Sequence, residues 1–243
     1  MTKSTHPAAE FLDALGKGVL DLLYPPKCVV CGEVQPLYLC VDCRSRISAM
    51  EGPLCRKCGL PTDGEPCAEC RRTRFAFTRA RAVGVYDGAL RTAIHRLKYG
   101  GVRAVAPELG DLLTAHLAGS ADSCPGAASV LPMPIHSSRR RERGFNQSLL
   151  LAGPVSDFLG VPLLEDVLIR VRASRPQVDL PVDERMNNVR GVFKVERPEM
   201  ITGTAVLLVD DVMTTGSTAD EAARALRHAG ASAIYVLTLA RSC

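Results

Sequence analysis

The stretch TAVLLVDDVMTTGSTADEAARAL, from Thr204 to Leu226, decides the fold of this 243-residue chain. Its apolar start predicts a buried strand, two acids follow at Asp210 and Asp211, and a turn rich in Thr, Gly and Ser leads into an alanine-rich helix at 218–229. In an open α/β sheet the ligand site lies beyond the carboxyl ends of the strands, where helix amino termini direct N–H groups at anions. The chemistry of the chain is therefore expected at this turn.

The composition of the turn predicts a phosphate cradle. Gly216 allows the backbone to turn tightly, while hydroxyl groups supplement the backbone amides at Thr214, Thr215, Ser217 and Thr218. The carboxylates of Asp210 and Asp211 can accept hydrogen bonds from vicinal ribose hydroxyls. Such a turn can also be a simple helix cap, but neighbouring carboxylates repel each other, so a polar ligand or cation explains the acids better. The Walker A pattern G-x-x-x-x-G-K-[ST] is absent.

Helical and apolar strand-like segments alternate from about Phe75 onward, which predicts an α/β domain with a mainly parallel sheet. The candidate strands are 80–86, 129–133, 204–209 and 233–239, and the candidate helices are 88–98, 105–118, 146–159 and 218–229. We assign this domain to residues 74–243, a cysteine-rich domain to 27–73 and an amino-terminal segment to 1–26. An amphipathic helix is predicted at 8–23, with its apolar face packed on the rest of the protein.

The cysteine-rich domain contains four C-x-x-C pairs in a repeated arrangement. Every cysteine of the first half recurs 27 residues later, and eight residues separate the two pairs within each half, which indicates duplication. The eight cysteines are Cys28, Cys31, Cys40, Cys43, Cys55, Cys58, Cys67 and Cys70.

Two such pairs complete the four-cysteine tetrahedral shell of a structural zinc ion, so the spacing predicts two zinc sites with no open coordination position. Disulfides and plain buried thiols are the alternatives; a reducing compartment opposes the first and the strict pairing opposes the second. Pairing in sequence order is favoured, while an interleaved arrangement, with Cys28 and Cys31 sharing a metal with Cys55 and Cys58, stays open. Cys124 and Cys243 fall outside the pattern and are interpreted as incidental.

The bulk composition is that of a globular protein with a mild basic charge. Hydrophobic residues make up 47% of the chain, and the formal net charge is +4. This charge tolerates a polyanionic partner but is weak for a dedicated nucleic-acid binder. Asp13, Lys17 and Asp21 interrupt the amino-terminal apolar segment, so neither a membrane span nor a signal peptide is expected, and we predict a cytoplasmic protein without membrane insertion.

The residues VLLVDDVMTTGST resemble the diphosphate-sugar binding motif of type I phosphoribosyltransferases. The whole chain resembles the ComF family, which joins a double zinc ribbon to such a domain and is associated with natural competence and DNA uptake. The likeness is carried by LLYPPKCVVC at 22–31, VLPMPIHSSRRRERGFNQSLLLA at 130–152 and RPQVDLPVDERMNNVRGVF at 175–193. It implies a type I phosphoribosyltransferase-like α/β fold preceded by a double zinc ribbon.

The resemblance also implies site residues for 5-phosphoribosyl diphosphate (PRPP). The acids Asp210 and Asp211 would hold the ribose hydroxyls and act in any catalysis. The 5-phosphate would lie against the rest of the motif, at Val212, Met213, Thr214, Thr215, Gly216, Ser217 and Thr218.

Basic residues elsewhere are implied as further contacts. The loop after Met133 would bind pyrophosphate through Arg139, Arg140, Arg141 and Arg143, although a solvated basic face or a nucleic-acid contact explains these arginines equally well. The segment from Arg170 to Arg190 would form a lid, with Arg172, Arg175, Arg185 and Arg190 as phosphate partners. Lys98 either reaches the site or is a surface lysine.

Two classes of function follow. The first is a phosphoribosyltransferase-like protein that binds PRPP or a related ribose phosphate with Mg²⁺ and acts in DNA uptake; whether it catalyses pentosyl transfer, and to which acceptor, stays open. The second is a non-catalytic adaptor that binds single-stranded DNA or a protein such as a DNA-uptake helicase through the ribbons and the arginine loop. Because aromatic residues are 5% of the chain and tryptophan is absent, any DNA contact is expected to be mainly electrostatic.

Overall fold

The computed structural model describes residues 25–120, 123–172 and 191–242. The helix predicted at 8–23 lies outside these residues. Among the described residues, no helix has both the length and the apolar character needed to cross a membrane.

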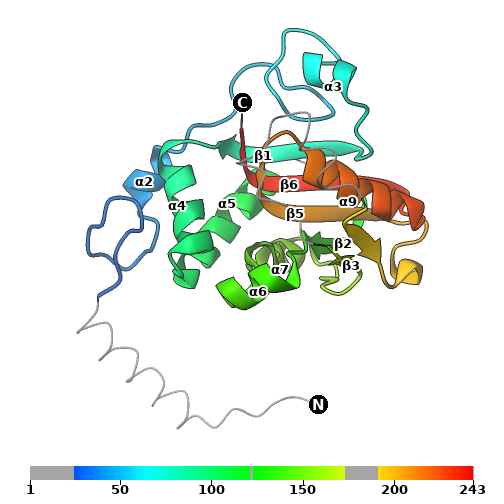
Figure 1. Cartoon of the computed structure of the whole chain (residues 1–243). Helices are drawn as coiled ribbons and strands as arrows, with labels where there is room; N and C mark the ends of the chain where they lie inside the picture. The colour runs from blue at the N-terminus through cyan, green and yellow to red at the C-terminus, as the bar shows by residue number, and fades with distance from the viewer. Residues whose placement is uncertain (1–24, 121–122, 173–190, 243) are drawn as a thin grey trace.

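A four-stranded parallel sheet forms the centre of the molecule (Figure 1). Its strand order is β1–β6–β5–β2, in which all neighbours are parallel. The strands are β1 (Arg79–Val85), β2 (Ala127–Pro132), β5 (Ala205–Met213) and β6 (Ala233–Arg241). The central strands β5 and β6 are almost continuously apolar and buried, as expected for a parallel sheet covered on both faces.

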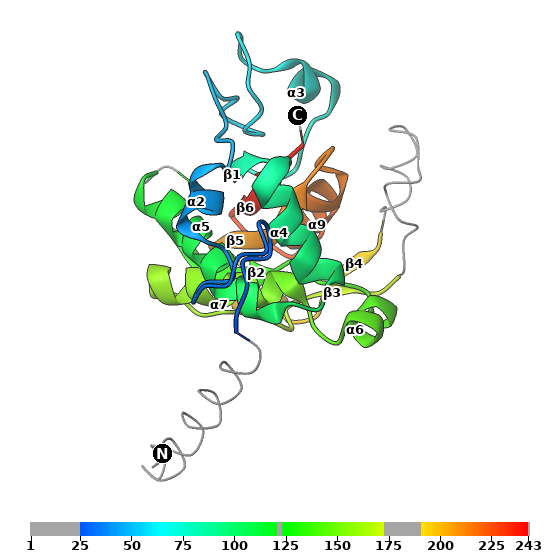
Figure 2. The same ribbon diagram turned by 90° about the vertical axis from the view of Figure 1, so that its left-hand side faces the viewer.

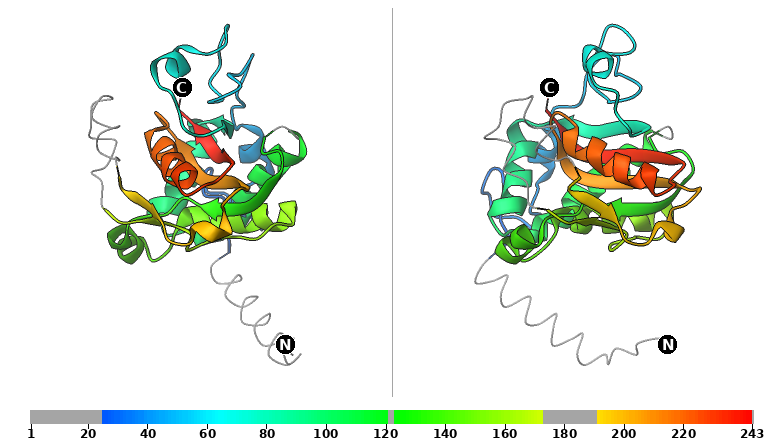
Figure 3. Two further views of the ribbon diagram at one scale, coloured as in Figure 1. Left: turned by 90° about the vertical axis from the view of Figure 1, so that its right-hand side faces the viewer. Right: turned by 45° about the vertical axis from the view of Figure 1, so that its right-hand side comes forward.

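Helices cover both faces of this sheet (Figures 1 and 3). One face packs on α4 (Gly88–Tyr99), α5 (Ala106–Ala118) and α7 (Gln147–Leu159), and the other packs on α9 (Ser217–His228). The alternation of side chains along a strand produces this division. In β5, Leu207 and Val209 belong to the core of the first face, whereas Val206 and Leu208 belong to the core of the second.

Short elements complete the domain. They are a 3-10 turn η1 (Arg103–Val105), helix α6 (Ser137–Arg143), an antiparallel pair β3 (Leu168–Arg170) and β4 (Phe193–Val195), and a second 3-10 turn η3 (Pro198–Met200). The sequence did not predict them, because segments of three to seven residues carry too little periodicity.

The two halves of the cysteine-rich domain sit at different places on the sheet domain. The first cysteine module (Cys28–Cys43) ends within α2 (Val41–Ser45), which lies beside α4 in Figure 2 and contacts it. The second cysteine module (Cys55–Cys70) contains the start of α3 (Ala68–Arg72) and lies over β1 in Figure 1.

The cysteine-rich domain also covers the free edge of β1. The amide of Ala80 donates to the carbonyl of Lys57 over 2.7 Å, and the amide of Val85 donates to the carbonyl of Ser48 over 2.9 Å. Covering an edge in this way satisfies backbone groups that would otherwise be open to pairing with another chain.

The predicted fold class is confirmed: a mainly parallel sheet with flanking helices follows a cysteine-rich region. Each of the four predicted strands and four predicted helices corresponds to one element, with bounds that differ by one to a few residues. The largest difference is at β5, which continues to Met213, so that the two acids lie within the strand rather than after it.

Candidate functional site

The second acid of the motif, Asp211, is buried at the carboxyl end of β5. It is 3% exposed, and its Oδ1 lies 2.9 Å from Nζ of Lys98, at the last turn of α4. Its other oxygen, Oδ2, is buried and has no hydrogen-bond partner among the described residues. Buried polar atoms are nearly always hydrogen-bonded, so this oxygen is suited to a ligand hydroxyl or a cation.

The first acid, Asp210, is held by α7. Its Oδ1 accepts hydrogen bonds from Oγ of Ser148 and from the amide of Asp211, both over 2.9 Å. Burial and the neighbouring Asp211 raise the pKa of Asp210 to about 7, against the lowering effect of Lys98. A carboxyl group poised near neutral pH is typical of binding and catalytic sites.

Gly216 determines the shape of the turn Thr214–Thr218, which the sequence predicts to bind phosphate and which is called the phosphate-binding turn below. Its φ of +81° places it in the left-handed region, where it is the amino-terminal cap of α9. A glycine adds no capping side chain there, so the first turn of α9 stays accessible to an anion, which the helix dipole favours. Thr215 Oγ1 and Ser217 Oγ hydrogen-bond each other over 2.7 Å, and the buried Arg241 donates from Nη1 to the carbonyl of Thr214 over 2.9 Å.

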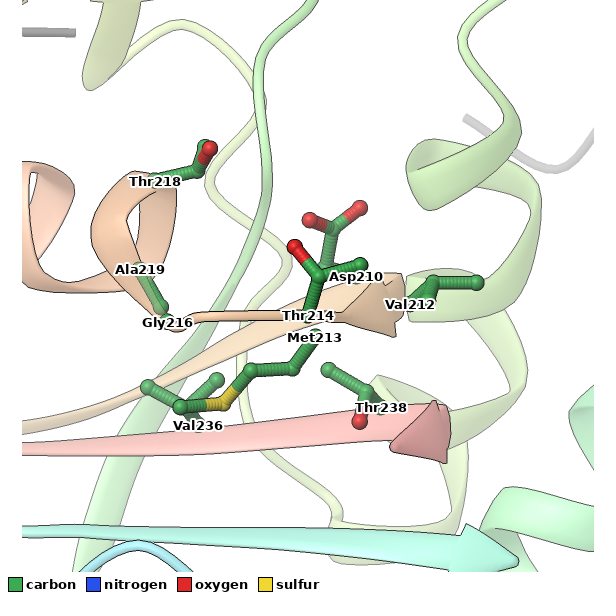
Figure 4. Close-up of a pocket in the computed structure, with 9 residues that line it drawn as sticks. All are labelled: Asp210, Val212, Met213, Thr214, Gly216, Thr218, Ala219, Val236 and Thr238. Carbon is green, nitrogen blue, oxygen red and sulfur yellow. The ribbon is translucent and has the colours of Figure 1, made fainter. Parts of the chain in front are cut away.

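The turn and the first acid line one pocket, shown in Figure 4. The pocket spans about 290 Å³, a volume that includes solvent at its open side. It is lined by Asp210, Val212, Met213, Thr214, Gly216, Thr218, Ala219, Val236 and Thr238. Six of the nine residues proposed from the motif therefore line it, while Asp211, Thr215 and Ser217 lie around it.

The arginines predicted on a pyrophosphate-binding loop lie instead on the short helix α6, which corrects the loop assignment. The helix forms because His136 Nδ1 caps the amide of Ser138 at its start and Gly144, with a φ of +79°, ends it. Arg140 pairs with Glu165 over 3.3 Å.

The last arginine of α6, Arg143, donates a hydrogen bond from Nη1 to Oε1 of Gln147. Its guanidinium lies over the Tyr99 ring, 5.3 Å from the centroid. None of the four arginines lines the pocket in Figure 4. Their predicted role therefore stays a prediction.

Most of the predicted lid lies outside the described residues, including Arg175, Arg185 and Arg190. Arg172 is described and donates from Nη2 to the carbonyl of Gly191 over 3.0 Å.

The structure adds Ser148 and Arg170 to the candidate site and resolves the alternatives for Lys98. Ser148 contacts Asp210 from a helix 62 residues away, which no local pattern could reveal. The pKa of Arg170 is lowered by burial and by Arg139, and Asp210 opposes this effect, so Arg170 lies within electrostatic range of the acids. Lys98 reaches the site: although burial disfavours its charge, Asp211 and Asp210 raise its pKa.

The eight cysteines form two clusters in sequence order, Cys28–Cys31–Cys40–Cys43 and Cys55–Cys58–Cys67–Cys70. The interleaved alternative is therefore wrong. In each cluster all four sulfur atoms lie within 4.8 Å of one another. A tetrahedron of sulfurs around zinc has edges of about 3.8 Å, given Zn–S bonds of about 2.3 Å.

The individual sulfur distances agree with that tetrahedral edge. They are 3.9 Å for Cys31–Cys40, 3.7 Å for Cys55–Cys70 and 3.4 Å for Cys58–Cys67. Backbone amides also donate to sulfur, at Cys43 N to Cys40 Sγ and at Cys70 N to Cys67 Sγ. Burial opposes ionisation, but such backbone hydrogen bonds lower the pKa of Cys28 and of Cys55 to about 6. The donor set therefore fits two structural zinc ions.

Comparison with known proteins gives two family matches. A double zinc ribbon domain matches residues 19–72, and a phosphoribosyl transferase domain matches residues 146–242. Among solved structures, the glutamine phosphoribosylpyrophosphate amidotransferase of B. subtilis is 22% identical to this chain. The match covers 55% of this chain and 25% of the amidotransferase chain, and its TM-score of 0.37 is too low to carry an argument.

Three curated relatives match over most of their length. The DNA utilization protein YhgH of Salmonella typhi is 34% identical over 82% of this chain and 86% of its own. The competence protein F of Haemophilus influenzae is 30% identical over 84% of this chain and 90% of its own. The competence protein ComFC of Bacillus subtilis is 28% identical over 84% of each chain.

Proposed function

The chain belongs to the family of the DNA utilization protein YhgH and competence protein F, the ComF family, and on that premise we propose that its α/β domain binds PRPP or a related ribose phosphate. The observation that carries the proposal is the orphan Oδ2 of Asp211, because a buried carboxylate oxygen without a partner is suited to a ribose hydroxyl or a cation. The phosphate-binding turn lies at the end of the same strand, as a ribose 5-phosphate requires.

Each part of the site has a task in this proposal. The amides at the start of α9 and the hydroxyls of the turn bind the 5-phosphate. Asp210 and Asp211 accept hydrogen bonds from the ribose hydroxyls, and Lys98 forms an ion pair with Asp211 that holds this carboxylate in place. Asp211 Oδ2 offers the oxygen ligand that Mg²⁺ prefers, and the ion would neutralise charge on a diphosphate.

Transfer of the pentosyl group to a nitrogen nucleophile is the reaction that such a site supports. A developing diphosphate needs positive charge beyond that of the turn. Lys98 interacts with both acids, and Arg170 interacts with Asp210 and with the neighbouring Arg139, so these three cations are candidates to supply it. Binding of the ligand without turnover remains within the proposal, because a fold and a ligand site do not by themselves establish catalysis.

The biological setting that we propose is DNA uptake or use in the cytoplasm. Competence and DNA utilization are the words in the names of the relatives. Eight cysteines in metal-binding geometry fit a reducing compartment.

A second candidate function is a DNA- or protein-binding adaptor. It is favoured by α6, where Arg140 and Arg141 are exposed and Arg141 has no ion pair among the described residues. Such a surface would contact a nucleic-acid backbone, with binding that weakens steeply as salt increases. Single-stranded DNA and a DNA-uptake helicase are the partners that this candidate predicts.

Calorimetric titration of the zinc-loaded protein with PRPP and Mg²⁺ tests the ligand. Replacing Asp210 and Asp211 together by asparagine keeps the shape of the site and removes its charge, so we expect at least a tenfold weaker affinity. Asp166→Asn is the control, because the side chain of Asp166 is 78% exposed and lies outside the pocket. Absence of binding by the wild type, with no competition by ribose 5-phosphate, would overturn the proposal.

A further inference from the structure

The second cysteine module and the phosphate-binding turn share one buried cluster. Cys55, Cys58 and Cys67 belong to the same core as Met213 and Ala219, which flank the turn. The first cysteine module belongs to the other core, with α4, α5 and α7. Only the second cysteine module therefore packs into the layer of the molecule that holds the turn.

Phe75, five residues after the last cysteine of the second cysteine module, packs against the turn. It is 5% exposed, and its Cε1 lies 3.2 Å from the position that a Cβ on Gly216 would occupy. Met213 Cε lies 2.7 Å from the same position. Phe77 stacks on Phe75 with ring centroids 4.8 Å apart, so the supporting ring is itself fixed.

The backbone around Phe75 is fastened to the helix that begins at the turn. The amide of Ala76 donates to Oδ1 of Asp220, which is 4% exposed in the first turn of α9. Arg227 donates from Nη2 to the carbonyl of Ala76 over 3.1 Å, and Arg224 pairs with Asp220 over 3.0 Å. Displacing residues 74–76 would therefore disturb the start of α9.

The other end of the second cysteine module is anchored to the sheet. The carbonyl of Lys57, between two ligand cysteines, accepts from the amide of Ala80 in β1 over 2.7 Å. A Cβ on Gly59 would lie 2.8 Å from the carbonyl oxygen of Ala80, so the module approaches β1 as closely as a backbone can. In the sequence, Phe75 lies between Cys70 of the cysteine cluster and Ala80 at this anchor, so both ends of the segment that carries it are held by the module.

We propose that the second cysteine module positions the phosphate-binding turn. Phe75 and Asp220 are the positioning residues: the first supports the left-handed backbone of Gly216, and the second ties the start of α9 to the chain that leaves the module. The identity of the ligand rests on the proposed function, whereas the conformation of the turn can be measured without a ligand.

Phe75→Ala in the full-length, zinc-loaded protein tests the inference. We expect faster hydrogen–deuterium exchange in the peptide that contains residues 212–220, at least a tenfold weaker affinity for ribose 5-phosphate, and an unchanged zinc content. Phe75→Leu should restore most of the wild-type exchange rate and affinity, because leucine keeps apolar contact with the turn. Leu39→Ala is the matched control: Leu39 is a fully buried residue of the first cysteine module, and its loss should leave the exchange of 212–220 within about twofold of wild type.

The outcomes separate this inference from the proposed function. If Phe75→Ala changes neither the exchange nor the affinity, the inference is overturned. If exchange at 212–220 rises while the wild type itself binds no ribose 5-phosphate, the positioning role stands and the proposed ligand fails. If Phe75→Ala does not fold, Asp220→Asn decides, because it weakens both the link to Ala76 and the ion pair with Arg224 at the start of α9; unchanged exchange in that variant also overturns the inference.

Discussion

The two cysteine modules have the same ligand spacing and nevertheless pack against different parts of the molecule. The first places Leu39 and three of its cysteines in the core of α4, α5 and α7, and its Tyr38 amide donates to Glu108 over 2.9 Å. The second joins the core of α9. A duplicated motif thus supplies a repeated metal site, while the residues between the cysteines determine which surface each copy contacts.

This difference assigns each module to one side of the ligand site. The first packs on α4, whose last turn carries Lys98, the ion-pair partner of Asp211. The second packs near the turn that contains Gly216. Perturbing one module should therefore affect one side of the site more than the other.

The largest effect is expected from removing the metal ligands of one module. Cys28→Ser with Cys31→Ser, or Cys55→Ser with Cys58→Ser, should each lower the zinc content from two ions to one and unfold that module, because zinc contributes on the order of 10 kcal/mol to small metal-dependent folds. Metal analysis and thermal unfolding measure this. Replacing all four of these cysteines should remove both ions; one retained ion would show that the modules share ligands.

Lys98→Met probes the side of the first module. It leaves Asp211 buried without its counter-ion, so we expect a loss of about 3 kcal/mol in the free energy of unfolding at pH 7. Lys194→Met is the control, because the Lys194–Glu196 pair has the same 2.9 Å separation but is exposed and should contribute less than about 1 kcal/mol. Equal losses in urea denaturation would contradict a buried pair at the site.

Asp210→Asn should change the pH dependence of stability. The folded-state pKa of Asp210 is raised from 3.8 to about 7, so between pH 4 and 7 the folded chain holds a proton that the unfolded chain has released. The contribution of Asp210 to stability therefore falls as pH rises through this window, by about 3 kcal/mol. Relative to wild type, the variant should gain stability between pH 4 and 7; parallel denaturation curves across that range would refute the raised pKa.

Gly216→Ala probes the side of the second module and has the smallest expected effect on stability. A left-handed conformation costs a non-glycine residue about 1 kcal/mol. The new Cβ would meet the flexible end of Met213 and, 3.2 Å away, the ring of Phe75. Gly153→Ala is the matched control: Gly153 lies within α7 with no atom near its Cβ position, so alanine should be neutral or stabilising there. The affinity for ribose 5-phosphate should fall only in the Gly216 variant.

The sequence predicted the fold and the centre of the candidate site because their signals are local. Apolar periodicity marks the strands, cysteine spacing marks the modules, and the acids and turn occupy one continuous motif. The contacts from Ser148 to Asp210 and from Phe75 to Gly216 join residues far apart in the chain, so only packing reveals them. The family resemblance implied a loop for the arginines after Met133, whereas a capping histidine and a terminating glycine make Ser137–Arg143 helical.

The pairing of β1 with β6 has a consequence for the order of events during synthesis. Arg79 pairs with Tyr235, so β1 can pair with β6 only after most of the chain has left the ribosome. The four cysteines of each module lie within 16 residues of one another and emerge earlier. Metal loading can therefore precede closure of the sheet, and the nascent chain would already carry a folded second cysteine module whose Lys57 carbonyl can pair with the edge of β1.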